Sequence, residues 1–214
     1  FSTGGAIMDV PAVVDGIIYV ASYDGYVYLL DAAAGQEVRR YYVSDPSPMD
    51  YGYYSGALST PLVDAATIYA AYGPLRAIDI QSGEIKWTVF DSKKYKDQIT
   101  GSPFFFEDSI IVATNDAIYA IDKTSGETEW TYSDIKGSVY FTPTLHEEVI
   151  YVGGSSGYLY GIQAETGEQV FRYNLRHLDL LSYASLFGNM VFPPGVDEQN
   201  IYVKWFSDLY AIKK

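Results

Sequence analysis

Three tyrosines stand close together in one polar stretch of the sequence, and their spacing suits recognition of a partner. Tyr51, Tyr53 and Tyr54 follow Asp50 within SDPSPMDYGYYSGALS, residues 44–59. A tyrosine ring offers a flat apolar surface with a polar tip, which suits contacts with peptides or sugars. We therefore expect these tyrosines to bind a partner. The alternative is that their rings pack down onto the domain that carries them.

A second candidate stretch, residues 176–192, carries a histidine. It reads RHLDLLSYASLFGNMVF, so Arg176 and His177 precede an apolar run, and the alternative here is an additional strand or helix that covers the domain. The remaining candidates for ligand or partner binding are Asp24, Asn115, Asp116 and Trp205. The first three of these also suit simple turn formation, because short polar side chains bind the backbone of their own turn.

The residue types present do not assemble a catalytic site. The chain of 214 residues has two histidines and no cysteine, which excludes thiol chemistry, disulfides and zinc–thiolate sites. A hydrolytic triad needs a nucleophile, a base and an orienting acid that converge, and nothing in the sequence places such a set. The 27 acidic residues leave a carboxylate calcium site open, although no EF-hand spacing is present. We expect no catalytic residues and no metal site.

Charge and hydropathy exclude two further classes of partner. The formal net charge is −13, and such a surface repels a phosphate backbone unless a local basic patch exists. The only short basic run, KKYK at 93–96, lies between Asp91 and Asp97. No apolar run approaches the roughly 20 residues of a membrane-spanning helix. We expect neither nucleic-acid binding nor membrane insertion.

The elements that must position these residues come from an internal repeat. AIDIQSGEIKW at 77–87 returns as AIDKTSGETEW at 120–130. In four copies an acidic or amide residue stands four positions before a glycine. In each of these copies an arginine or an aromatic residue stands four positions after the same glycine. These positions are Asp31, Gly35 and Arg39; Asp79, Gly83 and Trp87; Asp122, Gly126 and Trp130; and Gln163, Gly167 and Phe171. Glycine suits a left-handed turn position, and aspartate at the turn start caps its own backbone.

Each repeat reads as four short strands. In the fourth copy, FTPTL, VIYVGG, YLYGIQ and QVFRYN alternate with the turns HEE, SSG and AETGE. Repeats of about 40 residues with four strands are typical of β-propeller blades, which bury their apolar faces by stacking on one another. The prediction is an all-β protein with a single propeller domain at 1–214 and repeats near 1–45, 46–97, 98–136, 137–181 and 182–214. Trp87 and Trp130 should wedge between blades.

The pattern A-x-D-x-x-[ST]-G-x-x-x-W, with preceding strands such as IYV and turns such as SSGYLY, resembles the pyrroloquinoline-quinone-like repeat. The resemblance spans nearly the whole chain. It implies either a quinoprotein dehydrogenase or a non-enzymatic propeller, such as a BamB-like scaffold or a kinase sensor domain. The quinone enzyme would bind the cofactor over calcium with a stacking tryptophan, for which Trp205 is the only residue that the repeat does not use. No set of ligand positions carries over.

The leading hypothesis is therefore a non-catalytic scaffold that holds a protein or glycan partner outside the cytoplasm, in the periplasm or at the cell surface, and needs no cofactor. The alternatives are a dehydrogenase fragment with pyrroloquinoline quinone and calcium, and a purely structural segment of a surface protein. The fifth copy stops at LYAIKK within its third strand, so we expect a fragment or an incompletely closed ring. An open blade edge would favour self-association.

Stretches 44–59 and 176–192 both connect an outer strand to the next inner strand, so we expect them on one face, together with the turns between second and third strands. Function in propellers usually lies in such variable loops on a rigid scaffold.

Overall fold

The computed structural model describes residues 1–43, 59–90, 98–175, 193–205 and 208–214. The strands of these residues form five antiparallel sheets in chain order. The first blade contains β1 (Ala12–Val14), β2 (Ile17–Ala21), β3 (Tyr26–Asp31) and β4 (Glu37–Tyr42). The second contains β5 (Leu62–Val63), β6 (Thr67–Ala71), β7 (Leu75–Asp79) and β8 (Ile85–Val89).

The third blade contains β9 (Phe104–Phe106), β10 (Ser109–Ala113), β11 (Ile118–Asp122) and β12 (Thr128–Tyr132). The fourth contains β13 (Thr144–His146), β14 (Val149–Gly154), β15 (Tyr158–Gln163) and β16 (Gln169–Asn174). The fifth is a sheet of three strands, β17 (Gly195–Val196), β18 (Asn200–Trp205) and β19 (Asp208–Lys213). In each sheet the strands lie in sequence order, as expected of a propeller blade.

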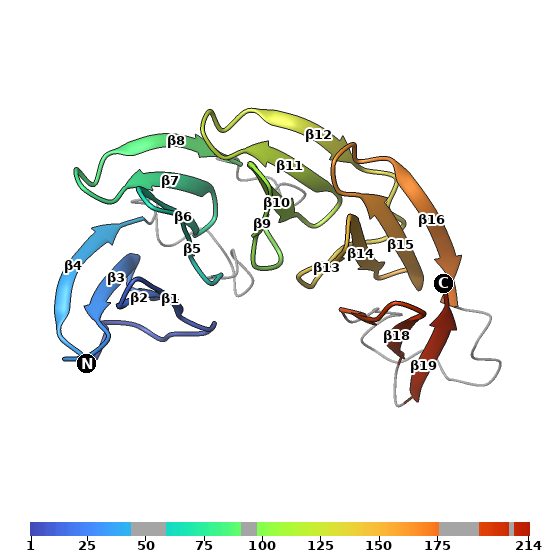
Figure 1. Cartoon of the computed structure of the whole chain (residues 1–214), viewed down its shortest axis with the longest axis horizontal. Coiled ribbons are helices and arrows are strands. Elements are labelled where there is room, and N and C mark those ends of the chain that lie inside the picture. The colour runs from blue at the N-terminus through green and yellow to red at the C-terminus, as the bar shows by residue number, and fades with distance from the viewer. Residues whose placement is uncertain (44–58, 91–97, 176–192, 206–207) are drawn as a thin grey trace.

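The blades follow one another round an open arc, with the short strands β5, β9 and β13 toward the inside and β4, β8, β12 and β16 at the outside (Figure 1). In the described part of the chain the two ends of the arc do not meet. The predicted β-propeller architecture is confirmed. Residues 1–11 belong to no strand, and the ring of Phe1 lies 5.4 Å from that of Tyr28 in the first blade.

Apolar residues from neighbouring blades form the core. One cluster combines Tyr19, Val27 and Leu29 of the first blade with Ile68 and Ile78 of the second. Three equivalent clusters join the second blade to the third, the third to the fourth and the fourth to the fifth. Because side chains alternate along a strand, each sheet presents one apolar set to each neighbour. The core of the molecule is thus distributed between the blades.

The repeated aspartate caps its own turn. The carboxylate of Asp79 accepts the backbone N–H groups of Gln81, at 3.0 Å, and Ser82, at 2.8 Å. Asp31 and Asp122 make the corresponding pair of bonds in their own turns. Hydrogen bonding from Ser82 and Lys86 lowers the pKa of Asp79 to about 2. The turn at Gln163 has no aspartate cap; there the N–H of Gly167 donates to the Gln163 carbonyl at 2.9 Å, and the N–H of Glu168 donates to Thr166 Oγ1 at 3.3 Å.

Each tryptophan of the repeat locks its blade to the next one. Trp87 Nε1 donates to the carbonyl of Lys123 at 3.2 Å, and Trp130 Nε1 donates to the carbonyl of Ala164 at 3.0 Å. A Cβ atom placed on Gly167 would lie 2.6 Å from the Trp130 ring, so the ring rests directly on that glycine. The turn glycine is therefore required twice, for its positive φ of 72° and for the ring stacked against it.

Candidate functional site

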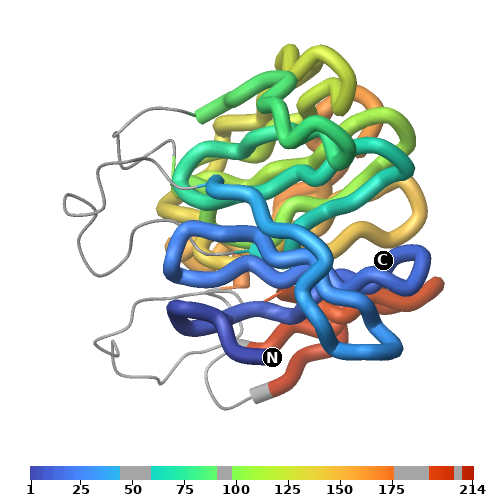
Figure 2. The backbone as a smooth tube through the Cα atoms, turned by 90° about the vertical axis from the view of Figure 1, so that its left-hand side faces the viewer, coloured from blue at the N-terminus to red at the C-terminus, as the bar shows by residue number. Residues whose placement is uncertain are grey.

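The turns between second and third strands share one face with the links from each blade to the next. The N–H of Val43, after β4, donates to the carbonyl of Gly25 in the β2–β3 turn at 2.8 Å. Leu175, after β16, bonds in the same way to Gly157 at 2.9 Å. We call this the connection face. These anchored residues, Val43 and Leu175, immediately precede the two long stretches singled out in the sequence. Figure 2 views the arc from the side, with the N-terminal blade toward the reader.

Asp24 lies in the β2–β3 turn on the connection face and is tied into the fold. Its Oδ2 atom accepts the hydroxyl of Tyr28 at 2.6 Å and the N–H of Gly4 at 2.7 Å. Partial burial alone would raise the pKa of Asp24, but hydrogen bonds from Tyr28, Ser22 and the backbone outweigh it and hold the pKa below its ordinary value. Asp24 is therefore an ionised anchor that fastens the N-terminal segment to the first blade.

Asn115 and Asp116 lie in the β10–β11 turn of the same face. Asn115 is buried, at 3% exposure, and its backbone carbonyl accepts the N–H of Val139 at 2.9 Å. Its own N–H donates to the carbonyl of Gln98 at 3.1 Å. Asp116 is only half-buried. Of the two, Asp116 has the more exposed side chain.

The other predicted binding residues fall where the structure gives little or no description. Tyr51, Tyr53, Tyr54 and His177 lie outside the described residues. Trp205 is the last residue of β18, where it pairs with Asp208, and its side chain is outside the description. The structure thus locates Asp24, Asn115 and Asp116 on the connection face and leaves the tyrosine site a prediction.

One polar group on the inner side of the arc was not found from the sequence. The Asp9 carboxylate accepts the N–H of Thr60 at 3.0 Å and the hydroxyl of Ser102 at 2.5 Å, so it joins three blades. The chain of contacts continues from the N–H of Ser102 to Thr142 Oγ1 at 2.8 Å. Burial opposes ionisation of Asp9, but these bonds keep its pKa below the ordinary value. The available signal was a Thr or Ser immediately before Pro61, Pro103 and Pro143.

The described residues do not fit a quinone cofactor held over calcium. Within the described ranges, no group of three or more His, Asp or Glu residues could hold a metal ion. The indole rings of Trp87 and Trp130 pack against Gly126 and Gly167, so one face of each ring is used in the contact between blades. In the same part of the chain the structure contains no helix with the length and apolarity needed to cross a membrane.

Comparison with known proteins gives a family from the sequence and a fold from the structure. A family model described as outer membrane protein assembly factor BamB matches residues 2–102 and 92–212. BamB of Salmonella typhimurium is 30% identical over 75% of this chain, which spans 40% of that protein. The crystal structure of BamB from Moraxella catarrhalis superposes with a TM-score of 0.68 at 18% identity, covering all of this chain and 62% of that one.

A quinohemoprotein alcohol dehydrogenase from Comamonas testosteroni superposes with a TM-score of 0.72 over 98% of this chain and 41% of its own. At 16% identity this likeness reflects the shared propeller fold alone. The match to the BamB model, by contrast, extends over nearly every residue. The chain therefore belongs to the BamB family of propellers built from pyrroloquinoline-quinone-like repeats.

Proposed function

We propose that this chain is a non-catalytic scaffold that binds a protein partner outside the cytoplasm. The observation that carries the proposal is the similarity to BamB over three quarters of the chain, together with a family model that extends over almost all of it. BamB is named an outer membrane protein assembly factor. The partner we propose is accordingly a protein component of outer-membrane protein assembly, and the compartment is the periplasm.

The structure supports a scaffold role through the way its polar and aromatic groups are used. Asp79 and Trp87 serve the turns and blade contacts, and Asp24 fastens the N-terminal segment. Such groups rigidify the blades and leave recognition to the connections between them. Binding would then use the connection face, with Tyr51, Tyr53 and Tyr54 as aromatic anchors and with Asp116, His177 and Trp205 beside them. Aromatic anchors commonly dominate the energetics of protein interfaces.

The test places a photo-crosslinking amino acid on each face of the propeller. One variant carries it at Tyr54, and the control carries it at Ala33, an exposed residue of the β3–β4 turn on the opposite face. We expect position 54 to capture one envelope protein and position 33 to capture none. The double substitution Tyr53→Ala with Tyr54→Ala should abolish capture from a crosslinker at Asp116 while the circular dichroism spectrum stays unchanged.

Three results would count against the proposal in different ways. Equal capture from both positions would place the partner elsewhere on the molecule. Capture of a glycan would replace the class of partner. An absence of any captured molecule in the organism's own envelope would favour a purely structural segment.

A further inference from the structure

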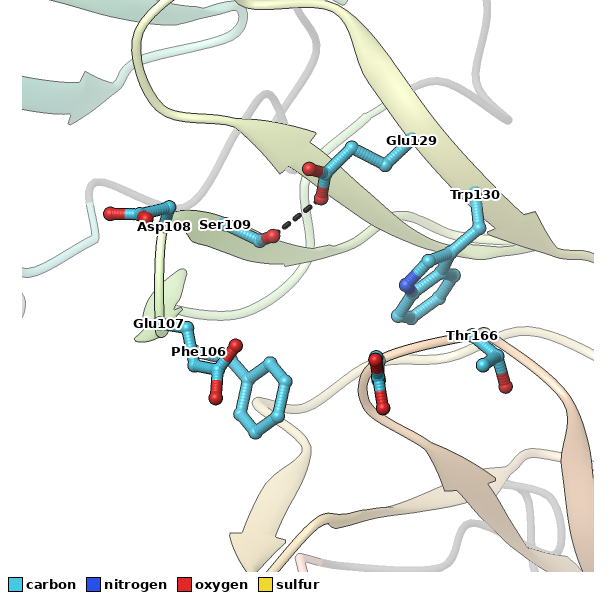
Figure 3. A pocket seen from close by; sticks show the side chains of 8 residues that line it. Phe106, Glu107, Asp108, Ser109, Glu129, Trp130 and Thr166 are labelled. Atoms are coloured by element: carbon cyan, nitrogen blue, oxygen red, sulfur yellow. Dashed lines mark hydrogen bonds between the residues drawn. The ribbon is translucent and has the colours of Figure 1, made fainter.

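A hollow of about 410 Å³ lies between the third and fourth blades (Figure 3). It is formed by the β9–β10 turn, the outer strand β12 and the β15–β16 turn. These turns join first to second and third to fourth strands, so they lie on the face opposite the connection face. We call it the blade 3–4 groove. Its lining residues are Phe106, Glu107, Asp108, Ser109, Glu129, Trp130, Glu165 and Thr166.

Two aromatic rings form the apolar part of the groove. Phe106 and Trp130 are half-buried, and Figure 3 shows both rings beside the same open space. The Trp130 ring cannot turn away, because its Nε1 atom donates to the carbonyl of Ala164 at 3.0 Å and its ring rests on Gly167. The groove therefore has a fixed aromatic wall, which a ligand meets without reorganisation of the protein.

Four carboxylates line the same groove. Asp108 is paired with Lys123, at 2.6 Å between the carboxylate and Nζ. Glu129 accepts the hydroxyl of Ser109, a neutral donor, as the dashed line in Figure 3 marks. Glu107 and Glu165 are exposed and make no ion pair with any described residue. Three carboxylates thus face the hollow without a cation from the described part of the chain.

The chain itself shows that the fold does not require these acids. The equivalent positions between the second and third blades follow from the strand pairing, in which Leu62 meets Tyr69 as Phe104 meets Ile111. There Trp87 takes the place of Trp130, but the carboxylates are replaced. Ala65 and Ala66 stand for Glu107 and Asp108, Lys86 for Glu129, and Thr124 for Glu165. The tryptophan is architectural. Asp64 stands there for Phe106, and in the fourth blade Glu147 and Glu148 stand for Glu107 and Asp108, so acids also occur at the equivalent turns of other blades. Particular to the blade 3–4 groove is the combination of the Phe106 and Trp130 rings with Glu129 and Glu165.

We propose that the blade 3–4 groove binds an arginine side chain presented by a polypeptide. A guanidinium plane stacks on an indole face, and its N–H groups pair with carboxylates. The aliphatic stem of the arginine covers the Phe106 ring. A hollow of this size accommodates the side chain together with part of its neighbours. This site is on the face opposite the proposed tyrosine site and shares no residue with it, so either can fail without the other.

The experiment uses two pentapeptides and the ¹⁵N-labelled chain. The probe is acetyl-Gly-Gly-Arg-Gly-Gly-amide. In the control peptide citrulline replaces the arginine, because citrulline has the shape of arginine without the charge. We expect the arginine peptide to shift the Trp130 indole N–H and the backbone amides of Glu129 and Glu165 saturably. The citrulline peptide should bind about tenfold more weakly, because the cation–π contact and the ion pairs are lost.

Variants that copy the residues at the equivalent positions between the second and third blades complete the test. Glu129→Lys and Glu165→Thr introduce residues that this chain already tolerates at equivalent positions, so folding should be retained. Their combination should abolish the shifts, whereas Glu84→Gln, in the β7–β8 turn of the same face, should leave them unchanged. Shifts that do not saturate, equal binding of the citrulline peptide, or undiminished binding by the double variant would each overturn the proposal.

Discussion

A single added methyl group should separate the two reasons for the repeated turn glycine. Gly35 and Gly167 occupy the same place in the first and fourth repeats, with φ values of 66° and 72°. Alanine in this left-handed conformation costs about 1–2 kcal/mol at either position. A Cβ on Gly35 meets nothing within 4 Å, so the stability lost by Gly35→Ala should be this backbone term alone.

Gly167→Ala should lose more, because its Cβ would lie 2.6 Å from two atoms of the Trp130 ring. The ring is held by the hydrogen bond to Ala164, so it cannot withdraw without breaking that contact. Overpacking of this kind costs typically about 1–3 kcal/mol. The total loss for Gly167→Ala is then about 2–5 kcal/mol, and the difference between the two variants measures the contact between blades.

Urea unfolding followed by circular dichroism gives the comparison, provided that the slopes of the transitions agree. A second pair, in which Gly167→Ala is introduced into Trp130→Ala, closes a double-mutant cycle. In that background the glycine substitution should cost no more than Gly35→Ala does. Equal losses for the two single variants, or a coupling energy near zero, would show that the ring does not rest on the glycine as described.

Two further predictions concern single polar contacts. Trp87→Phe removes the donor to the Lys123 carbonyl together with the pyrrole part of the indole, which packs against the core, so it should cost at least about 1 kcal/mol of unfolding free energy in the same urea assay. An unchanged free energy of unfolding would contradict the role given to this contact. Asp9→Asn tests the carboxylate that joins three blades. Folding lowers the pKa of Asp9, so the ionised carboxylate stabilises the folded protein at pH values above its ordinary pKa of 3.8. This stabilisation is lost as the pH falls through the pKa of the folded state. The variant should be less stable at pH 6 and should lose less on acidification than the parent, with Asp15→Asn as the unchanged control; a parallel decline in both proteins would contradict this.

The blades could be predicted because their signals are local. In the fourth repeat, the predicted strands VIYVGG, YLYGIQ and QVFRYN coincide with β14, β15 and β16. The inner strand was placed less well, since β13 begins only at Thr144, after Pro143, and includes His146. Proline has no N–H to donate to a neighbouring strand. Alternation of strand direction also sufficed to group Asp24 and Asn115 on one face.

Contacts between blades could not be read from the sequence in the same way. The bonds of Asp9 to Thr60 and Ser102 depend on how far the arc bends between the blades, which no local pattern encodes. The same holds for the blade 3–4 groove, whose acids come from residues as distant as Glu107 and Glu165. Comparison of equivalent repeat positions, Lys86 against Glu129 for example, was the available signal for that groove.

Titration of the intact chain with pyrroloquinoline quinone, with and without calcium, is the most direct test of the scaffold assignment. Tryptophan fluorescence provides the readout, because Trp87 and Trp130 lie between the blades and Trp205 is the one tryptophan outside the repeat. A non-catalytic scaffold predicts a flat titration at micromolar cofactor in both conditions. Saturable quenching that requires calcium would contradict the account and identify a quinone-binding enzyme.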